Sequence, residues 1–148
     1  MLGMANNKTL LAPSSSPKKV VGIVEALIYD STGKILLLRR SENNSIYVGK
    51  WQLPGGKVEK NESALQAIKR EVREEISCNC RSVKKLREIE FSNIFRNKKE
   101  TVKLTVFSCD IDGQLALSTD HSELKFFTPK NIPKTRLAPA SLRAIFSK

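Results

Sequence analysis

Three glutamates within five residues, Glu71, Glu74 and Glu75, form the group in this sequence that most clearly points to chemistry. Their spacing of i, i+3 and i+4 would place them on one face of a helix. The chain around them is basic, with 26 Lys and Arg against 15 Asp and Glu. Hard cations such as Mg²⁺ prefer oxygen ligands from carboxylates and carbonyls. The cluster therefore predicts a divalent-cation site.

A salt-bridged surface helix is the alternative explanation of the same carboxylates. Like charges at these spacings repel one another weakly, and Lys69, Arg70 and Arg73 could serve only to neutralise them. The Gly55-Gly56 pair just before this segment favours the cation site, because glycine lets backbone carbonyls approach a ligand closely. Whatever chemistry occurs rests on carboxylates, since the single histidine excludes a site that needs two imidazole ligands.

A helix over residues 63–76 is expected to carry the cluster. Ser63 can cap its N-terminus, and Gln66 three residues later completes a capping box. One stripe of apolar residues recurs at helical spacing and is predicted to be buried: Leu65, Ile68, Val72 and Ile76.

The elements that must position this helix alternate between strand-like and helical patterns. Residues 20–30, which are rich in β-branched residues, and the apolar residues of 34–40 are strand-like and are expected to form a hairpin across the turn at 31–33. Further strands are predicted at 51–53, 83–95, 101–111 and 124–127, a return strand at 114–117 after an Asp112-Gly113 turn, a polar loop at 41–50, and a closing helix at 139–146.

Length and composition limit the class of protein. A chain of 148 residues suits one domain with one core, here residues 20–148, preceded by a polar tail over 1–19. No apolar run approaches the roughly 20 residues that cross a bilayer, so no membrane association is expected. Three cysteines without a C-x-x-C pair favour neither a disulfide framework nor a zinc site, and indicate the reducing cytoplasm.

The formal charge of +11 is concentrated in two segments. Residues 81–103 carry eight bases against three acids, and residues 124–148 carry six bases and no acid. Such surfaces attract nucleotides, polyphosphates or nucleic acid. A surface that only keeps the protein soluble explains the charge equally well at this stage.

The segment 56–78 resembles the Nudix box, G-x5-E-x7-R-E-U-x-E-E-x-G-U, where U is a bulky aliphatic residue. The matching positions are Gly56, Glu62, Arg70, Glu71, Val72, Glu74 and Glu75. Ser77 and Cys78 depart from the pattern, and Ser77 replaces a glycine that would ease a left-handed turn at the end of the helix. The lead-in from Trp51 to Glu59 is similar to that of MutT-type members of this family.

This resemblance implies an α+β fold, the Nudix fold, in which a mixed β-sheet is sandwiched between helices (α/β/α). It also implies a hydrolase that uses Mg²⁺, with Mn²⁺ as a substitute, to cut a phosphoric anhydride bond. By that likeness Glu74 and Glu75 bind the metal with the Gly55 carbonyl, and Glu71 is a metal ligand or the general base. Arg70 would orient a glutamate, Glu62 would support the site, and Asp120 would supply a late acid.

Besides Glu62, substrate contacts are implied at four further positions. Arg40 and Gly56 would lie near the phosphates, and Leu53 would line the nucleoside pocket, although a core leucine is an equally good explanation. Ser141 stands where related enzymes place an asparagine or aspartate that reads the base. A short hydroxyl cannot reproduce the bidentate pattern of an amide, so specificity for 8-oxo-dGTP does not follow.

Four functions are compatible with these residues. A pyrophosphohydrolase that converts (deoxy)nucleoside triphosphates to monophosphate and pyrophosphate is favoured, including one for oxidised or non-canonical nucleotides. An RNA 5′-pyrophosphohydrolase, which would have nucleic acid as its partner, is an alternative. The positive charge supports it, but the sequence lacks an aromatic-rich platform for RNA. A hydrolase of dinucleoside polyphosphates or nucleotide sugars is a third possibility. The sequence is also compatible with a homodimer. The intact acidic set argues against a non-catalytic binding module.

Overall fold

The computed structural model describes residues 19–147, so the expected tail, apart from Lys19, lies outside the described residues. Its strands are β1 (Val20–Leu27), β2 (Ile35–Arg40), β3 (Trp51–Gln52), β4 (Gly55–Lys57), β5 (Asn79–Phe95), β6 (Lys98–Asp112) and β7 (His121–Phe127). The two α-helices are α2 (Ala64–Ile76) and α3 (Pro139–Phe146), and short 3₁₀ turns occur at Pro129–Asn131 and Lys134–Arg136.

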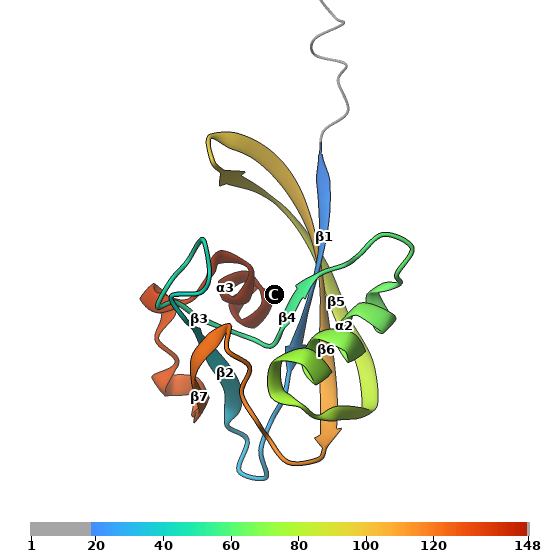
Figure 1. The fold of residues 1–148 in the computed structure, drawn as a ribbon, viewed down its shortest axis with the longest axis vertical. Coiled ribbons are helices and arrows are strands. Elements are labelled where there is room, and N and C mark those ends of the chain that lie inside the picture. Colours follow the sequence, from blue (N-terminus) through green and yellow to red (C-terminus); the bar gives the residue numbers. More distant parts are fainter. Residues whose placement is uncertain (1–18, 148) are drawn as a thin grey trace, which may run out of the picture.

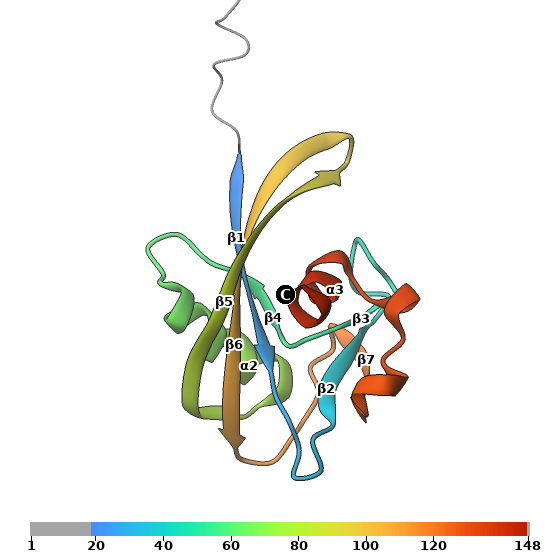
Figure 2. The same cartoon turned by 180° about the vertical axis from the view of Figure 1, so that it is seen from behind.

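The strands form two sheets, one in the order β4-β1-β6-β5 and one in the order β3-β2-β7. The first is mixed, because β1 runs parallel to β6 and antiparallel to β4. One apolar cluster packs beneath α2 and includes Val24, Ile68 and Val72. A second packs beneath α3 and includes Leu53 and Ala144. The helices lie on opposite sides of β1 (Figures 1 and 2). The α+β sandwich predicted from the sequence is therefore confirmed.

Helix α2 begins as its sequence predicts. The Ser63 hydroxyl accepts from the Gln66 backbone N–H at 3.0 Å, and the Gln66 side chain accepts from the Ser63 N–H at 2.9 Å. Ile68, Val72 and Ile76 are fully buried as expected. Leu65 is an error in the predicted stripe, because it is 44% exposed and Ala67 is buried instead. Ala64 and Ala67 are the residues of this part of the helix that pack on the core, so Leu65 lies off the buried face.

The C-terminus of α2 ends on a strained residue. Ser77 adopts a left-handed conformation with φ 61° and ψ 25°, and its N–H donates to the Arg73 carbonyl. Glycine is the usual residue at such a position, because a Cβ there costs energy.

Replacing Ser77 with glycine is expected to stabilise the fold by about 1 kcal/mol. Relief of the left-handed strain exceeds the extra chain entropy that glycine brings to the unfolded state. Urea denaturation would show a higher midpoint with an unchanged slope. Ser77→Ala is the control, since alanine keeps the Cβ and should give no gain. Equal midpoints for the two variants would contradict this explanation.

The first two strands are not the regular hairpin that the sequence predicts. Near the turn they are joined by the Tyr29–Ile35 bridge, with hydrogen bonds from Leu36 N–H to Ile28 O and from Asp30 N–H to Lys34 O. Beyond it, β1 pairs with β4 and β6, whereas β2 pairs with β3 and β7. The two strands diverge because β1 pairs with β6 over eight residues, and a simple hairpin with β2 would leave these positions unpaired.

The return strand predicted at 114–117 is also wrong, since this segment has no regular structure. Its backbone serves the end of α2 instead. The N–H groups of Ala116 and Ser118 donate to the carbonyls of Ile76 and Glu75, both at 3.0 Å. The last carbonyls of a helix need such partners, and this competes with pairing in a sheet. The predicted strands at 83–95, 101–111 and 124–127 and the helix at 139–146 are confirmed within β5, β6, β7 and α3.

Candidate active site

Arg70 is the centre of the carboxylate cluster on α2. Its Nε lies 2.7 Å from Glu62 Oε2, and its Nη1 lies 2.6 Å from Glu71 Oε1 and 3.0 Å from Glu74 Oε1. Its Nη2 also donates to the Lys57 carbonyl at 2.9 Å. The hydrogen bond from Arg70 lowers the pKa of Glu62 to about 2. One guanidinium thus gathers carboxylates from the helix entrance and from the helix itself.

Glu75 points to a different part of the site. Its Oε1 accepts from the Gly55 N–H at 2.8 Å, and its Oε2 lies 3.8 Å from His121 Nε2. Burial raises the pKa of Glu75 well above its ordinary value, and the nearby Glu71 carboxylate adds to this rise. The three glutamates of the cluster therefore divide into two that face Arg70 and one that is held inside by the β4 backbone.

The two glycines of β4 allow this close approach. A Cβ on Gly56 would stand 2.6 Å from Glu71 Oε2 and 2.7 Å from its carboxyl carbon. A Cβ on Gly55 would stand 2.0 Å from the Val24 carbonyl oxygen and 2.8 Å from Glu25 Cα. The absence of a side chain at Gly56 therefore leaves room for the Glu71 carboxylate, whereas its absence at Gly55 leaves room for strand β1.

The donor set suits a divalent cation in its chemistry. Within residues 19–147 no three acidic, histidine or cysteine side chains converge on a point that would hold an ion as they stand. Glu71 and Glu74 nevertheless share one nitrogen of Arg70, so one cation reaches both. Burial raises the pKa of Glu71, and the negative charge of Glu74 also contributes. Mg²⁺ binds carboxylate oxygens and would reduce the repulsion between these negative charges.

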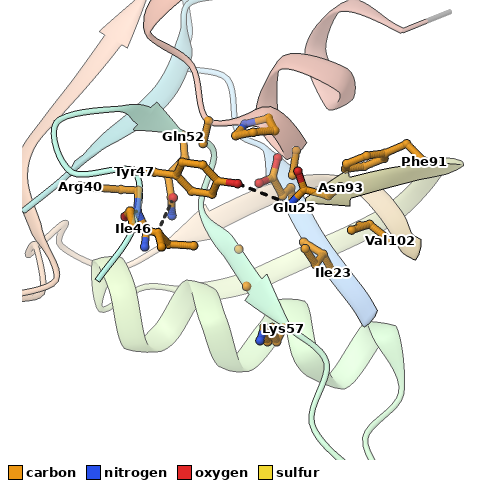
Figure 3. A pocket seen from close by; sticks show the side chains of 15 residues that line it. Ile23, Glu25, Arg40, Ile46, Tyr47, Gln52, Lys57, Phe91, Asn93 and Val102 are labelled. Atoms are coloured by element: carbon orange, nitrogen blue, oxygen red, sulfur yellow. Dashed lines mark hydrogen bonds between the residues drawn. The ribbon is translucent and has the colours of Figure 1, made fainter. Parts of the chain in front are cut away.

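A pocket of about 260 Å³ adjoins the cluster (Figure 3). Gly56 and Lys57 belong to both, since they line the pocket and contact Glu71 or Arg70. Its other walls are apolar side chains and a few polar ones, namely Ile23, Phe91, Val102, Glu25, Arg40, Gln52, Tyr47 and Asn93. The Asn93 amide donates to the Tyr47 hydroxyl at 3.4 Å. The 41–50 loop and β5 therefore meet across the pocket.

A buried carboxyl group lies in the wall of this pocket. Glu25 is 5% exposed, and its two oxygens lie 2.9 Å and 3.0 Å from Ser141 Oγ. Ser141 is itself fully buried and accepts from the Leu53 N–H at 2.9 Å. Burial raises the pKa of Glu25 to about 8, although the Ser141 hydrogen bond partly opposes the rise. At neutral pH the neutral acid is therefore the main form.

Stability is expected to depend on pH through Glu25. The unfolded carboxyl titrates near 4.5 and the folded one near 8, so the folded state binds the extra proton between these values. The stabilisation is complete below pH 4.5 and is lost as pH rises to 8, by up to about 4 kcal/mol. Glu25→Gln should remove this loss, and unfolding at pH 5 and pH 8 measures it. An unchanged pH dependence in the variant would contradict the assignment.

A chain of side chains connects the pocket to Glu75. Arg40 Nη1 donates to Gln52 Oε1 at 2.8 Å, so the Gln52 amide nitrogen faces His121 Nε2 at 3.2 Å. Burial, aided by the charge of Arg40, lowers the pKa of His121 to about 4. His121 is then neutral and accepts from Gln52. Gln52 and His121 thus connect Arg40 to Glu75 through a series of short side-chain contacts.

The remaining predicted residues lie at different depths. Leu53 is fully buried in the core beneath α3 and does not line the pocket. Arg40 lines the pocket and is half-buried. Asp120 is exposed, and its backbone carbonyl accepts from Ser41 and Asn44. Its carboxylate forms no ion pair with any residue from 19 to 147.

Sequence reasoning missed Glu25, Gln52, Tyr47 and Asn93. An acid in the middle of the apolar run of β1 was a usable signal, because an unpaired carboxyl is rarely buried without a purpose. Tyr47 and Asn93 gave no signal, since they meet only through the fold.

Comparison with known proteins agrees with this geometry. The family model described as the NUDIX domain matches residues 20–146. This chain belongs to the Nudix family. Among solved structures, the MutT protein from Methanosarcina mazei Go1 is 33% identical, with a TM-score of 0.74 over 89% of this chain and 94% of that one. The fold and the family expected from the Nudix box are thereby confirmed.

Curated Nudix relatives carry the names of nucleotide hydrolases. An ADP-ribose pyrophosphatase from Methanocaldococcus jannaschii is 36% identical over 108 residues, which are 72% of this chain and 62% of the relative. An 8-oxo-dGDP phosphatase from Danio rerio is 37% identical over 71 residues, which are 48% of this chain and 21% of the relative. The chain thus spans about three fifths and one fifth of these proteins. No helix within residues 19–147 has the length and apolar character to cross a bilayer.

Proposed function

We propose that this Nudix protein is a Mg²⁺-dependent hydrolase of (deoxy)nucleoside triphosphates that releases a monophosphate and pyrophosphate. The observation that carries the proposal is the shared wall between the carboxylate cluster and the pocket. Gly56 contacts Glu71 on one side and lines the pocket on the other. A nucleoside in the pocket would therefore place its phosphates beside the carboxylates of α2. The relatives named as nucleotide hydrolases support the substrate class.

Glu74, Glu75 and the Gly55 carbonyl would hold the ion, with Glu71 as a further ligand or as the general base. A bound divalent ion neutralises phosphate charge and lowers the pKa of a bound water. Arg70 orients Glu71 and Glu74 through its shared nitrogen, and Glu62 fixes the other edge of the guanidinium.

The chain's own residues also arrange the substrate. Arg40 brings a positive charge to the pocket wall and is held in place by Gln52 and by the Ile46 carbonyl. Burial lowers the pKa of Arg40, and the charges of Glu75 and Asp120 oppose this; Asp120 would supply the late acid. The three unpaired cysteines support the cytoplasm as the compartment.

A nucleotide panel tests the proposal directly. Ribo- and deoxyribonucleoside triphosphates, with oxidised and methylated forms, are incubated with Mg²⁺, with Mn²⁺ and with EDTA. We expect pyrophosphate and a monophosphate in both metals and no turnover in EDTA. Orthophosphate as the only phosphorus product would show that another bond is cut. Activity only on dinucleoside polyphosphates or nucleotide sugars would select that alternative, and full activity in EDTA would refute the metal requirement.

A further inference from the structure

The β5–β6 hairpin extends beyond the body of the protein. Both strands continue past the end of the sandwich, and the free end curves toward the side that carries α3 and the 41–50 loop (Figures 1 and 2). Arg96 and Asn97 form the turn with φ of 51° and 63°, which is the geometry of a tight two-residue hairpin turn. The extension is therefore a defined part of the fold with a well-formed turn.

One face of this extension continues the wall of the pocket. Side chains two residues apart on a strand lie on the same face. Phe91 and Asn93 line the pocket, so Phe95 follows them on the same face, roughly 7 Å beyond Asn93. On β6 the partners of Asn93 and Phe95 are Glu100 and Lys98, which lie on that face as well.

A second pocket, of about 320 Å³, occupies this position. It is lined by Lys19, Phe95, Arg96, Lys98, Lys99 and Glu100, which are four cations, one acid and one aromatic ring. Glu100 has a nearly buried side chain and pairs with Lys19 at 3.4 Å. The Arg96 guanidinium lies 5.0 Å from the centre of the Phe95 ring. Beyond this ion pair, the other three cations of the pocket form no ion pair with any residue from 19 to 147.

The outer pocket has the chemistry that binds single-stranded nucleic acid. Such sites combine positive charge along the backbone with aromatic rings on which bases stack. A free mononucleotide in the inner pocket would leave these groups unused. Because the two pockets meet at the Asn93–Glu100 pair, a ligand that fills both must continue past its first nucleotide.

We propose that the outer pocket binds the second nucleotide of a 5′-triphosphorylated single strand whose first nucleotide occupies the inner pocket. This proposal rests on the function proposed above and extends its substrate class. In the reaction, water attacks a phosphorus of the 5′-triphosphate and one anhydride P–O bond breaks. Pyrophosphate leaves, the strand keeps a 5′-monophosphate, and the proton of the water passes to solvent. The phosphodiester beyond the first nucleotide stays intact.

The test compares a 5′-triphosphorylated dinucleotide with the matching mononucleoside triphosphate. Phe95→Ala should lower kcat/KM for the dinucleotide by about 5- to 100-fold, the range of one lost base-stacking contact, and leave the mononucleotide value within about twofold. The double variant Lys98→Ala/Lys99→Ala should also weaken only the dinucleotide and reduce its salt dependence. Arg81→Ala/Lys84→Ala removes two exposed charges elsewhere on β5 and should change neither value.

Several outcomes would overturn the proposal. Equal losses on both substrates would show a general structural role for Phe95. A loss on a dinucleoside polyphosphate as large as on the dinucleotide would show that the pocket does not read a strand. Binding separates this proposal from the proposed hydrolysis, because fluorescence anisotropy of a labelled single-stranded tetranucleotide in EDTA needs no turnover. If wild type and Phe95→Ala bind that strand equally, the outer pocket is not its site.

Discussion

Glu74→Gln is expected to lower kcat by about 100-fold or more with nucleoside triphosphates while the protein stays folded. As the metal ligand proposed above, Glu74 would supply charge worth several kcal/mol at the transition state, and each 1.36 kcal/mol is a factor of ten in rate. The fold should tolerate the change because the Glu74 side chain is 55% exposed and forms one ion pair, with Arg70. Such a pair contributes about 0–1 kcal/mol to stability.

Pyrophosphate release and urea denaturation together measure this result. Glu90→Gln is the matched control, because it makes the same chemical change at an exposed position of β5, on the face opposite the pocket. Rates close to those of the unmodified protein in Glu74→Gln would contradict the role given to the α2 carboxylates. Loss of activity together with loss of folding would instead indicate that Glu74 acts through stability.

Alanine at the two adjacent glycines is expected to separate activity from folding. In Gly56→Ala the new methyl group meets the end of the Glu71 side chain, which can move aside, so we expect a folded protein whose activity falls by about 100-fold. In Gly55→Ala the methyl group meets backbone atoms of Val24 and Glu25, which cannot move without disturbing β1. The expected cost is about 3 kcal/mol of unfolding free energy.

Circular dichroism during thermal unfolding, with activity measured on the same samples, would check both expectations. Gly113→Ala provides a comparison at a glycine beyond the end of α2 that does not line the pocket, where the Cβ has ordinary contacts but φ is 106°. It should lower stability moderately and leave the activity of the folded fraction unchanged. A fully active Gly56→Ala would mean that the position of Glu71 does not matter for turnover.

The sequence predicts local features of this fold well. The start of α2 depends on Ser63 and Gln66, which are three residues apart, and its carboxylates are placed by helical spacing alone. The β7 strand and α3 also follow from short patterns. Each of these elements is determined by a few neighbouring residues, so it can be predicted without knowledge of the rest of the chain.

Features that depend on distant partners could not be predicted. The separation of β1 and β2 into two sheets follows from pairing with β6, which is far along the chain. Glu25 and Ser141 are 116 residues apart, and Tyr47 and Asn93 are 46 apart. The same reason explains Leu53, which the family resemblance would place in the pocket but which is fully buried in the core. Periodicity shows which residues share a face, and the fold decides what that face meets.

The position of Arg70 has a consequence for the cation binding proposed above. Its single positive charge is shared among Glu62, Glu71 and Glu74, so it offsets only part of their negative charge. A bound divalent ion would compete with Arg70 for the oxygens of Glu71 and Glu74 and would offset more of that charge. Because Arg70 already holds these side chains together, we expect the ion to matter for turnover more than for folding.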